Sequence, residues 1–323
     1  MTIFTNSLLL IVGMFLLVKG ADLFVDGASG IAKKLKIPTL IIGLTLVSIG
    51  TSAPELSVSI SASLQDANNM SFGNIVGSNI FNTLVVIGIS ALFVPLTVSK
   101  DMKKYDFPIL LGIYTTLLVF TFVLSPLTVT RIEAAILFAL FFVYTFFLII
   151  RSKKQGGEEE ESNTKVRKWY LDVIFSAIGL AGIIIGGDFV VDGAKVIASA
   201  LGMSELLIGL TIVAVGTSLP ELVTSIVAAR KGEHDIAVGN AIGSCMFNVI
   251  LILGTATLIC PVSVEWSAIV DVIVMLISVL AAWLISFKSG KFGKVPGIIF
   301  LLAYAIYLTY IILRDTGALT QLL

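Results

Sequence analysis

The sequence is poor in charge, cysteine and histidine. Of its 323 residues, 13% are charged and 57% are hydrophobic, and the charged share is about half that of a typical soluble domain. The 21 basic and 21 acidic residues balance, so the chain has no electrostatic footprint for nucleic acid. Two cysteines can build neither a disulfide scaffold nor a four-ligand zinc site. This composition excludes a soluble or disordered protein and predicts a membrane protein.

In place of charge the chain has long apolar segments, each close to the roughly 20 residues that cross a bilayer as a helix. The first segment has no basic residue before it and no small-residue cleavage site, so we interpret it as a retained helix rather than a signal peptide. The sequence predicts an all-α integral membrane protein with ten transmembrane helices, at approximately residues 4–27, 39–64, 71–94, 106–125, 130–150, 170–193, 205–230, 237–260, 266–286 and 296–313.

The basic residues are distributed unevenly between the two sides of the membrane. With ten crossings, 17 of the 21 lie in loops on the side reached after the first segment. Loops rich in lysine and arginine face the cytoplasm. We therefore expect an orientation in the plasma membrane with both termini extracellular and with the polar stretch 151–168 as a flexible cytoplasmic linker.

A sequence repeat with a constant offset of 166 residues divides the chain. GLTLVSIGTSAPE at 43–55 recurs as GLTIVAVGTSLPE at 209–221, and GNIVGSNIFN at 73–82 recurs as GNAIGSCMFN at 239–248. Each copy has five apolar segments, and an odd number makes the second copy enter the membrane from the opposite side. We expect two inverted five-helix repeats, an architecture typical of secondary transporters. Their predicted limits are 1–150, with motif region 43–82, and 169–323, with motif region 209–248, joined by 151–168.

Two acidic residues, Glu55 and Glu221, lie near the middle of the second and seventh segments. An ionised carboxylate at that depth costs about 3 kcal/mol on insertion scales. A protonated glutamic acid bonded to a neighbouring helix would explain one such residue. Two of them, at equivalent places in the same motif, are better explained by a shared cation site.

Helix breaks are expected beside both carboxylates. Pro54 and Pro220 each remove an intrahelical donor and free the carbonyl four residues earlier, while Gly50 and Gly216 loosen the same turn. A simple proline kink is the plain alternative. The freed carbonyls would join an oxygen cluster with hydroxyl groups on either side, from Thr51 and Ser52 and from Thr217 and Ser218.

Small polar residues follow one face of the third and eighth segments at a spacing of four. Such residues also mediate ordinary helix packing in membranes. Opposite the carboxylates, and repeated at the same offset, they are candidates for ligation: Ser78, Asn82, Ser244 and Asn248. Asn74 and Asn240 lie a turn further out, where they order the helix end. All these ligands are oxygens, which favours a hard cation such as Ca²⁺ or Na⁺.

The motifs GTSAPE and GTSLPE, each followed by the GN…GS…FN pattern, resemble the alpha-1 and alpha-2 repeats of the cation/calcium exchanger superfamily. The whole chain is most similar to prokaryotic sodium/calcium exchangers. The resemblance implies antiport of three Na⁺ for one Ca²⁺ by alternating access, with the first and sixth helices sliding, no cofactor and a complete site in one monomer. It also implies a Ca²⁺ site of Glu55, Glu221 and the carbonyls of Thr51 and Thr217. The implied Na⁺ sites use Ser52, Ser78, Ser218, Ser244 and the carbonyls of Ser48 and Ala214, with Asn82 and Asn248 in the middle.

Other functions stay open from the sequence. A proton/calcium exchanger of the same fold is the main alternative, although such proteins usually carry a GNxxE-type motif. An intramembrane enzyme lacks a recognisable catalytic arrangement, and a passive cation channel is the remaining alternative. Asn248 stands where potassium-dependent relatives have aspartate, which argues against potassium dependence. Cys245 stands where the motif more often has asparagine, as at Asn79, and is expected to be a small buried residue.

Overall fold

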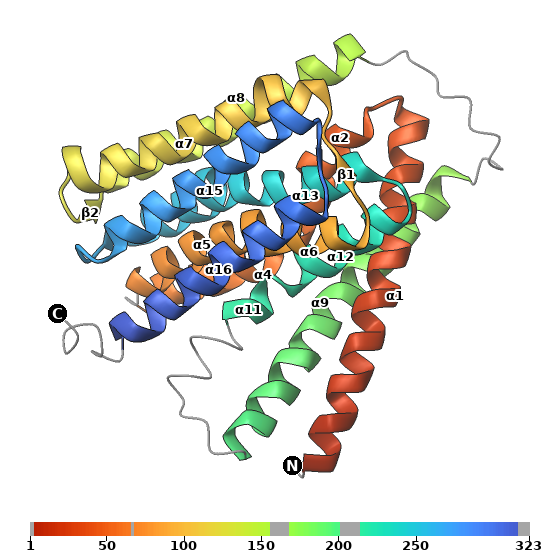
Figure 1. The fold of residues 1–323 in the computed structure, drawn as a ribbon, viewed down its shortest axis with the longest axis horizontal. Coiled ribbons are helices and arrows are strands. Elements are labelled where there is room, and N and C mark those ends of the chain that lie inside the picture. Colours follow the sequence, from red (N-terminus) through yellow and green to blue (C-terminus); the bar gives the residue numbers. More distant parts are fainter. Residues whose placement is uncertain (1–2, 66–67, 156–167, 201–213, 316–323) are drawn as a thin grey trace.

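The computed structural model describes residues 3–65, 68–155, 168–200 and 214–315. These residues are almost entirely helical (Figure 1). The first half contains α1 (Ile3–Leu35), α2 (Thr39–Ile42), α3 (Ser48–Thr51), α4 (Ala53–Leu64), α5 (Asn68–Phe81), α6 (Ile87–Phe93), α7 (Phe107–Val119) and α8 (Arg131–Gln155). The second half contains α9 (Trp169–Ala200), α11 (Ala214–Thr217), α12 (Leu219–Arg230), α13 (His234–Phe247), α14 (Gly254–Ile259), α15 (Ala268–Ser289) and α16 (Lys294–Asp315).

Short π-helical segments continue several of these helices. They are η1 (Gly43–Val47), η2 (Asn82–Val86), η3 (Met102–Asp106), η4 (Phe120–Leu124) and η6 (Asn248–Leu253). Segments of this kind are rare and frequently mark functional sites. Two of them, η2 and η6, begin at equivalent asparagines of the two repeats, Asn82 and Asn248.

Eight of the described helical segments are long and apolar enough to cross a membrane. A ninth crossing is the bent pair Thr39–Thr51 and Ala53–Leu64, whose halves meet at 48°. The expected seventh span, 205–230, lies outside the described residues up to 213, and from there α11 and α12 follow its course. Residues 151–155 of the predicted linker are helical and extend α8. The prediction of an all-α membrane protein is confirmed.

The outer helices expose large apolar side chains, including Ile132, Phe146, Phe287 and Ile306, as lipid-facing helices do. In contrast, α13 is buried along its whole length after its first two residues. The core of the molecule is thus the motif helices of both repeats, surrounded by helices that face the bilayer.

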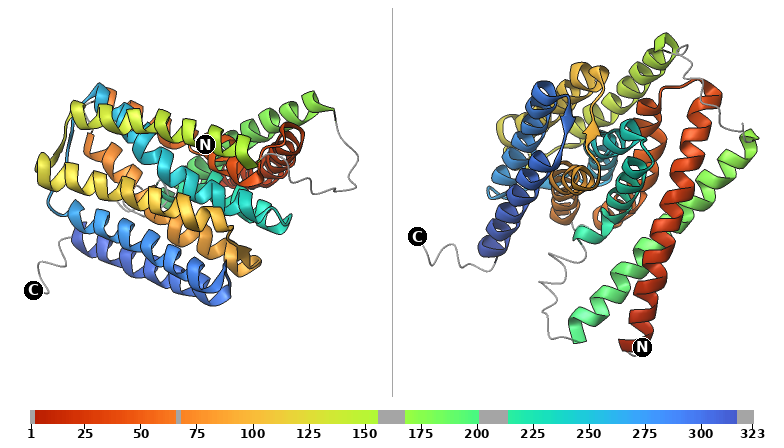
Figure 2. Two further views of the ribbon diagram at one scale, coloured as in Figure 1. Left: turned by 90° about the horizontal axis from the view of Figure 1, so that it is seen from above. Right: turned by 45° about the vertical axis from the view of Figure 1, so that its right-hand side comes forward.

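The first helices of the two repeats, α1 and α9, pack against each other along their length and stand to one side of the other helices (Figures 1 and 2). Their contact contains glycines spaced by seven: Gly13, Gly20 and Gly27 recur as Gly179, Gly186 and Gly193. A Cβ atom at Gly20 would lie 2.7 Å from the main-chain nitrogen of Ile183. Glycine is therefore required for this close approach, as in other tightly packed membrane helices.

Two short β pairings, which the sequence did not predict, join the repeats. Strand β1 (Leu96–Thr97) pairs antiparallel with β4 (Lys291–Phe292), and β2 (Thr128–Val129) pairs antiparallel with β3 (Val262–Ser263). Each pair takes one strand from each repeat. A strand of two residues is too short to produce an alternating pattern in the sequence, so these connections are visible only in the fold.

Candidate ion-binding site

Two interrupted helices carry the central carboxylates. The first is broken at Ser52, between α3 and α4, and the second at Ser218, between α11 and α12. A proline stands at the second position of α4 and of α12, and the glutamate follows it in the first helical turn. Glu55 and Glu221 therefore both lie at the amino-terminal end of a helix, where the backbone dipole favours negative charge. Both residues are fully buried.

Each carboxylate is held by a serine of the other repeat. Ser52 Oγ donates to Glu221 Oε1 at 2.8 Å, and Ser218 Oγ donates to Glu55 Oε1 at 3.0 Å. The two contacts are equivalent under the 166-residue offset. The candidate site is therefore formed between the repeats, and neither half contains it alone.

The serines of the third and eighth spans lie beside these pairs. Ser78 Oγ is 3.2 Å from Ser218 Oγ. Ser244 Oγ is 3.3 Å from Glu221 Oε1 and 3.4 Å from the carbonyl oxygen of Ser48. The structure thus brings together hydroxyl, carboxylate and carbonyl oxygens from both motif regions.

Several buried polar atoms around this cluster have no hydrogen-bond partner within the described part of the chain. They are Oε2 of Glu55, Oε2 of Glu221, Oδ1 of Asn248, and both amide atoms of Asn82. Buried polar atoms are usually satisfied, and leaving one unpaired destabilises a protein by about 1–3 kcal/mol. Four of the five atoms are oxygens, which is the donor set that Ca²⁺ and Na⁺ require.

Thr51 has a partner that the sequence did not identify. Its Oγ1 lies 3.0 Å from Oδ1 of Asn240, whose Nδ2 donates to the main-chain oxygen of Glu221 at 3.2 Å and to Ser225 Oγ at 2.9 Å. Asn240, expected to order a helix end, thus holds both motif helices in place. In the first repeat the equivalent contact is between Asn74 and Ser59, at 3.2 Å.

The remaining predicted residues lie near the helix breaks. Thr217 is the last residue of α11 and lines a cavity described below, and Ala214 is the first residue of α11. A Cβ atom at Gly50 would meet Phe24 and Leu180 at 3.2 Å, and one at Gly216 would overlap Val191. These two glycines therefore give α1 and α9 room to pack against the broken helices.

A cavity of about 400 Å³ extends from the candidate site along α5. It reaches from Ser78 and Thr217 to Glu265 and Arg314, and α15, α16 and the loop after β3 supply its other walls. On the α5 side, a Cβ atom at Gly73 or Gly77 would meet nothing within 4 Å. The equivalent glycines of α13 are packed against the start of the second span, at Leu40, Gly43 and Leu44. The described part of the site is therefore open on one side and closed on the other.

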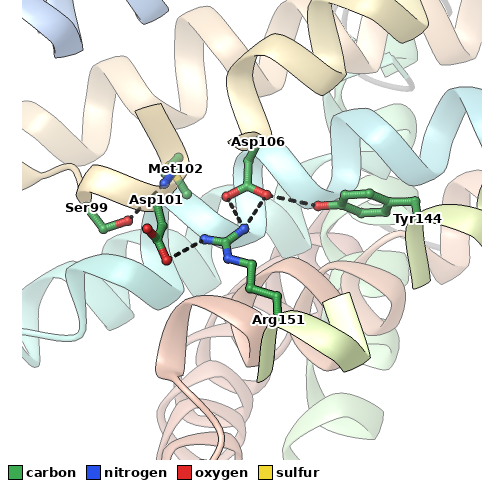
Figure 3. Close-up of polar contacts among 6 residues, drawn as sticks. All are labelled: Ser99, Asp101, Met102, Asp106, Tyr144 and Arg151. Atoms are coloured by element: carbon green, nitrogen blue, oxygen red, sulfur yellow. Dashed lines mark hydrogen bonds and ion pairs between the residues drawn. The ribbon is translucent and has the colours of Figure 1, made fainter. Parts of the chain in front are cut away.

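A second buried polar cluster lies outside the candidate site, at the end of α8 that leads into the linker (Figure 3). Arg151 Nη1 lies 2.8 Å from Asp106 Oδ1 and 2.9 Å from Oδ2, and Tyr144 donates to the same carboxylate at 3.5 Å. Asp101 forms a further ion pair with Arg151 at 3.4 Å. This cluster ties α8 to η3 and contributes no atom to the site between the repeats.

Known proteins resemble the chain along nearly its whole length. It is 40% identical over 311 residues to the putative antiporter CaxA of Alkalimonas amylolytica, covering 93% of this chain and 97% of that protein. It is 34% identical to the sodium/calcium exchanger MaX1 of Methanosarcina acetivorans, covering 94% and 97%. A solved structure of the sodium-calcium exchanger NCX_Mj superposes with a TM-score of 0.84 at 33% identity, covering 95% and 99%.

These relatives are named antiporters and exchangers, which identifies the chain as a transporter rather than an enzyme. The sodium/calcium exchanger protein family matches residues 5–150 and 171–313. The fold, the inverted motifs and these matches agree, and the chain belongs to the sodium/calcium exchanger family of integral membrane proteins.

Proposed function

We propose that the protein exchanges Na⁺ for Ca²⁺ by alternating access, with three Na⁺ for each Ca²⁺. The observation that carries this proposal is the reciprocal arrangement of Ser52 with Glu221 and of Ser218 with Glu55. It leaves one unpartnered carboxylate oxygen on each side of the repeat interface. Two carboxylates balance the charge of a single divalent cation, and the neighbouring hydroxyl and carbonyl oxygens suit a monovalent one.

The proposed Ca²⁺ ligands are the carboxylates of Glu55 and Glu221 and the carbonyls of Thr51 and Thr217. The proposed Na⁺ ligands are the hydroxyl groups of Ser52, Ser78, Ser218 and Ser244, the carbonyls of Ser48 and Ala214, and the carboxylates that both ions share. The amides of Asn82 and Asn248 line the middle of the proposed site. Because Ser52 and Ser218 already contact the carboxylates, a cation bound by the serines competes for the same oxygens. Competition for shared oxygens couples the two fluxes.

The proposed orientation places the linker 151–168 in the cytoplasm and both termini outside the cell. The cavity between Ser78 and Arg314 then opens to the extracellular side, because it is lined by the start of α5 and the end of α16. Glu265 stands in its wall, while Asp271 and Arg314 form an ion pair at 3.0 Å. This cavity is the proposed route by which external cations reach the serines.

Transport by purified protein in lipid vesicles tests the proposal. An outward Na⁺ gradient should drive Ca²⁺ uptake, whereas a pH gradient or a K⁺ gradient of equal size should not. Glu55→Gln and Glu221→Gln should each abolish uptake. Glu133→Gln is the matched control, since Glu133 is also buried but caps the start of α8 through Thr130.

The same vesicles measure the stoichiometry. Exchange of three Na⁺ for one Ca²⁺ moves one net charge, so an imposed membrane potential should change the Ca²⁺ gradient at which flux reverses. Uptake driven by the pH gradient and indifferent to Na⁺ would establish proton coupling instead. Flux without any coupling would indicate a channel.

A further inference from the structure

The two repeats meet at a pair of equivalent residues that differ in kind, Asn79 and Cys245. Asn79 Nδ2 donates to the main-chain oxygen of Cys245 at 3.2 Å, and Cys245 Sγ lies 3.6 Å from the main-chain oxygen of Asn79. Both residues are fully buried. The symmetry of the backbone contact is preserved, but one side presents an amide and the other a thiol.

This difference changes the hydrogen bonding of the two neighbouring asparagines in the candidate site, Asn82 and Asn248. Asn248 Nδ2 donates to Asn79 Oδ1 at 2.9 Å. That contact fixes the amide plane of Asn248 and leaves its Oδ1 as the unpartnered end. Asn248 is therefore held with an oxygen available to a cation.

The equivalent contact for Asn82 would require an amide oxygen at position 245, which the thiol of Cys245 does not provide. Neither Oδ1 nor Nδ2 of Asn82 has a hydrogen-bond partner among the described residues, and the side chain is fully buried. Asn82 lies one turn beyond Ser78 on the same helix face. Buried amides are usually paired, and the described residues supply no partner for this one.

A second pair of equivalent positions, next to Asn79 and Cys245, also differs between the repeats. Thr83 Oγ1 donates to the main-chain oxygen of Asn79 at 3.0 Å and lies 3.7 Å from Cys245 Sγ. The equivalent residue in the second repeat is Val249. One side of the interface thus has asparagine with valine, and the other has cysteine with threonine.

We propose that Cys245 is a positioning residue that leaves the amide of Asn82 free to turn, while Asn79 holds that of Asn248. One central amide is then a fixed ligand and the other an adjustable one. The adjustable amide presents its oxygen when Ca²⁺ fills the centre and turns aside when Na⁺ occupies the flanking oxygens. This inference rests on the proposed Na⁺/Ca²⁺ exchange and concerns how the same site discriminates between its two ions.

The test is the double variant Cys245→Asn/Thr83→Val, which gives Asn82 the same two residue types that Asn248 has at the equivalent positions, Asn79 and Val249. Fixing the Asn82 oxygen should favour Ca²⁺. Calorimetric titration of the purified protein should show Ca²⁺ binding about two- to tenfold tighter, the range expected for one hydrogen bond. More Na⁺ should be needed to displace Ca²⁺, and exchange in vesicles should have a lower KM for Ca²⁺ and a lower maximal rate.

Two controls separate positioning from packing. Thr83→Val alone adds no amide and should leave Ca²⁺ affinity within about twofold of wild type. Cys260→Asn makes the same substitution at the other cysteine, which lies beyond the end of α14. It should also leave the Ca²⁺ affinity unchanged. In an Asn82→Ala background, the double variant should produce no further change, because the amide it acts on is gone.

The reverse variant, Asn79→Cys/Val249→Thr, frees the amide of Asn248 and should weaken Ca²⁺ binding. If the first double variant does not fold, this reverse variant tests the role of the residues at positions 79 and 245 instead: unchanged Ca²⁺ affinity would overturn that role. Wild-type protein that binds Ca²⁺ in competition with Na⁺, together with a folded Cys245→Asn/Thr83→Val variant of unchanged affinity, would overturn this inference alone. Wild-type protein that shows no such competition would overturn the proposed function itself.

Discussion

Ser52 and Glu221 are 169 positions apart in the chain, and their side chains meet at 2.8 Å across the interface between the repeats. Ser218 and Glu55 make the equivalent contact at 3.0 Å. Each repeat thus contributes a carboxylate that the other repeat orients. This reciprocity explains why the motif occurs twice, because a single copy would leave its glutamate without the serine that holds it.

The first prediction concerns these serines. Ser52→Ala and Ser218→Ala should each reduce Na⁺-driven Ca²⁺ uptake, and by similar amounts, because the two contacts are equivalent. A hydrogen bond to a charged group contributes about 1.5–3 kcal/mol, which corresponds to roughly ten- to a hundredfold in apparent ion affinity. The measurement is the Na⁺ concentration that gives half-maximal exchange in vesicles.

Ser57→Ala is the matched control for this pair, since Ser57 is exposed on the same helix, α4. It should transport as wild type does. Normal exchange by Ser52→Ala or Ser218→Ala would show that the observed contacts do not form part of the transport site.

The second prediction concerns the glycines between α1 and α9. Gly20→Ala places a Cβ atom 2.7 Å from the main-chain nitrogen of Ile183 and 2.8 Å from the carbonyl oxygen of Gly179. Both obstacles are backbone, so the two helices must separate. We expect a lower melting temperature in detergent and reduced exchange.

Gly112→Ala should have the opposite effect on stability. A Cβ atom there meets nothing within 4 Å, and Gly112 is exposed on α7. Alanine is favoured over glycine in a helix by about 1 kcal/mol, so this variant should melt at the same or a higher temperature. A Gly20→Ala protein as stable as Gly112→Ala would contradict the close packing of α1 on α9.

The long-range pattern of the sequence predicted the all-α membrane fold, which the structure confirms, and it supplied the two repeats and the set of candidate residues as hypotheses. A constant offset of 166 residues identifies equivalent positions whatever their contacts. It does not indicate how the repeats dock, and so the pairing of Ser52 with Glu221 was not predicted. Asn240 shows the same limit, because its contacts with Thr51 and Ser225 depend on helix orientation rather than spacing.

The glycines beside the two helix breaks have a role that the sequence did not reveal. Gly50 and Gly216 were expected to loosen the helical turn before each proline. In the structure both lie inside short helices, α3 and α11, where a side chain would meet residues of α1 or α9. Sequence shows that glycine is present at such a position, but the neighbour that requires it is contributed by a distant part of the chain.

The third prediction concerns Lys231, which joins α12 to the second half of α1. Its Nζ lies 2.8 Å from Asp22 Oδ1 and 2.7 Å from Asp26 Oδ1. Nearby, Ser29 Oγ donates to Glu233 at 2.6 Å. The residue equivalent to Lys231 in the first repeat is Gln65, so the ion pairs are a property of one end of α1.

Lys231→Gln should therefore loosen α1 at that end without unfolding the protein. Partly exposed ion pairs contribute about 0.2–1 kcal/mol each, so amide hydrogen exchange in the second half of α1 should become roughly two- to fivefold faster. Added salt should reduce the difference from wild type, because it screens the pairs. Lys291→Gln, at an exposed lysine of β4, is the control. An unchanged rate of amide hydrogen exchange in α1 of Lys231→Gln would show that Lys231 does not hold this helix.

The fourth prediction concerns the buried ion pair between Arg151 and Asp106 (Figure 3). The Asp106 side chain is 0% exposed and that of Arg151 5%. Arg151→Leu would leave the carboxylate buried without its countercharge, and loss of one partner of a buried pair destabilises a protein by about 3–5 kcal/mol. The melting temperature in detergent should fall sharply.

Removing both charges distinguishes this pair from a simple packing contact. Most of the loss in Arg151→Leu comes from a buried charge without its countercharge, and Asp106→Asn removes that charge, so Asp106→Asn/Arg151→Leu should recover most of the stability that Arg151→Leu loses. Because the cluster contributes no atom to the site between the repeats, the recovered protein should also exchange Na⁺ for Ca²⁺ with the wild-type KM. A double variant as unstable as Arg151→Leu would indicate that the arginine acts through its contacts with Tyr105 and Asp101 rather than through the charge of Asp106.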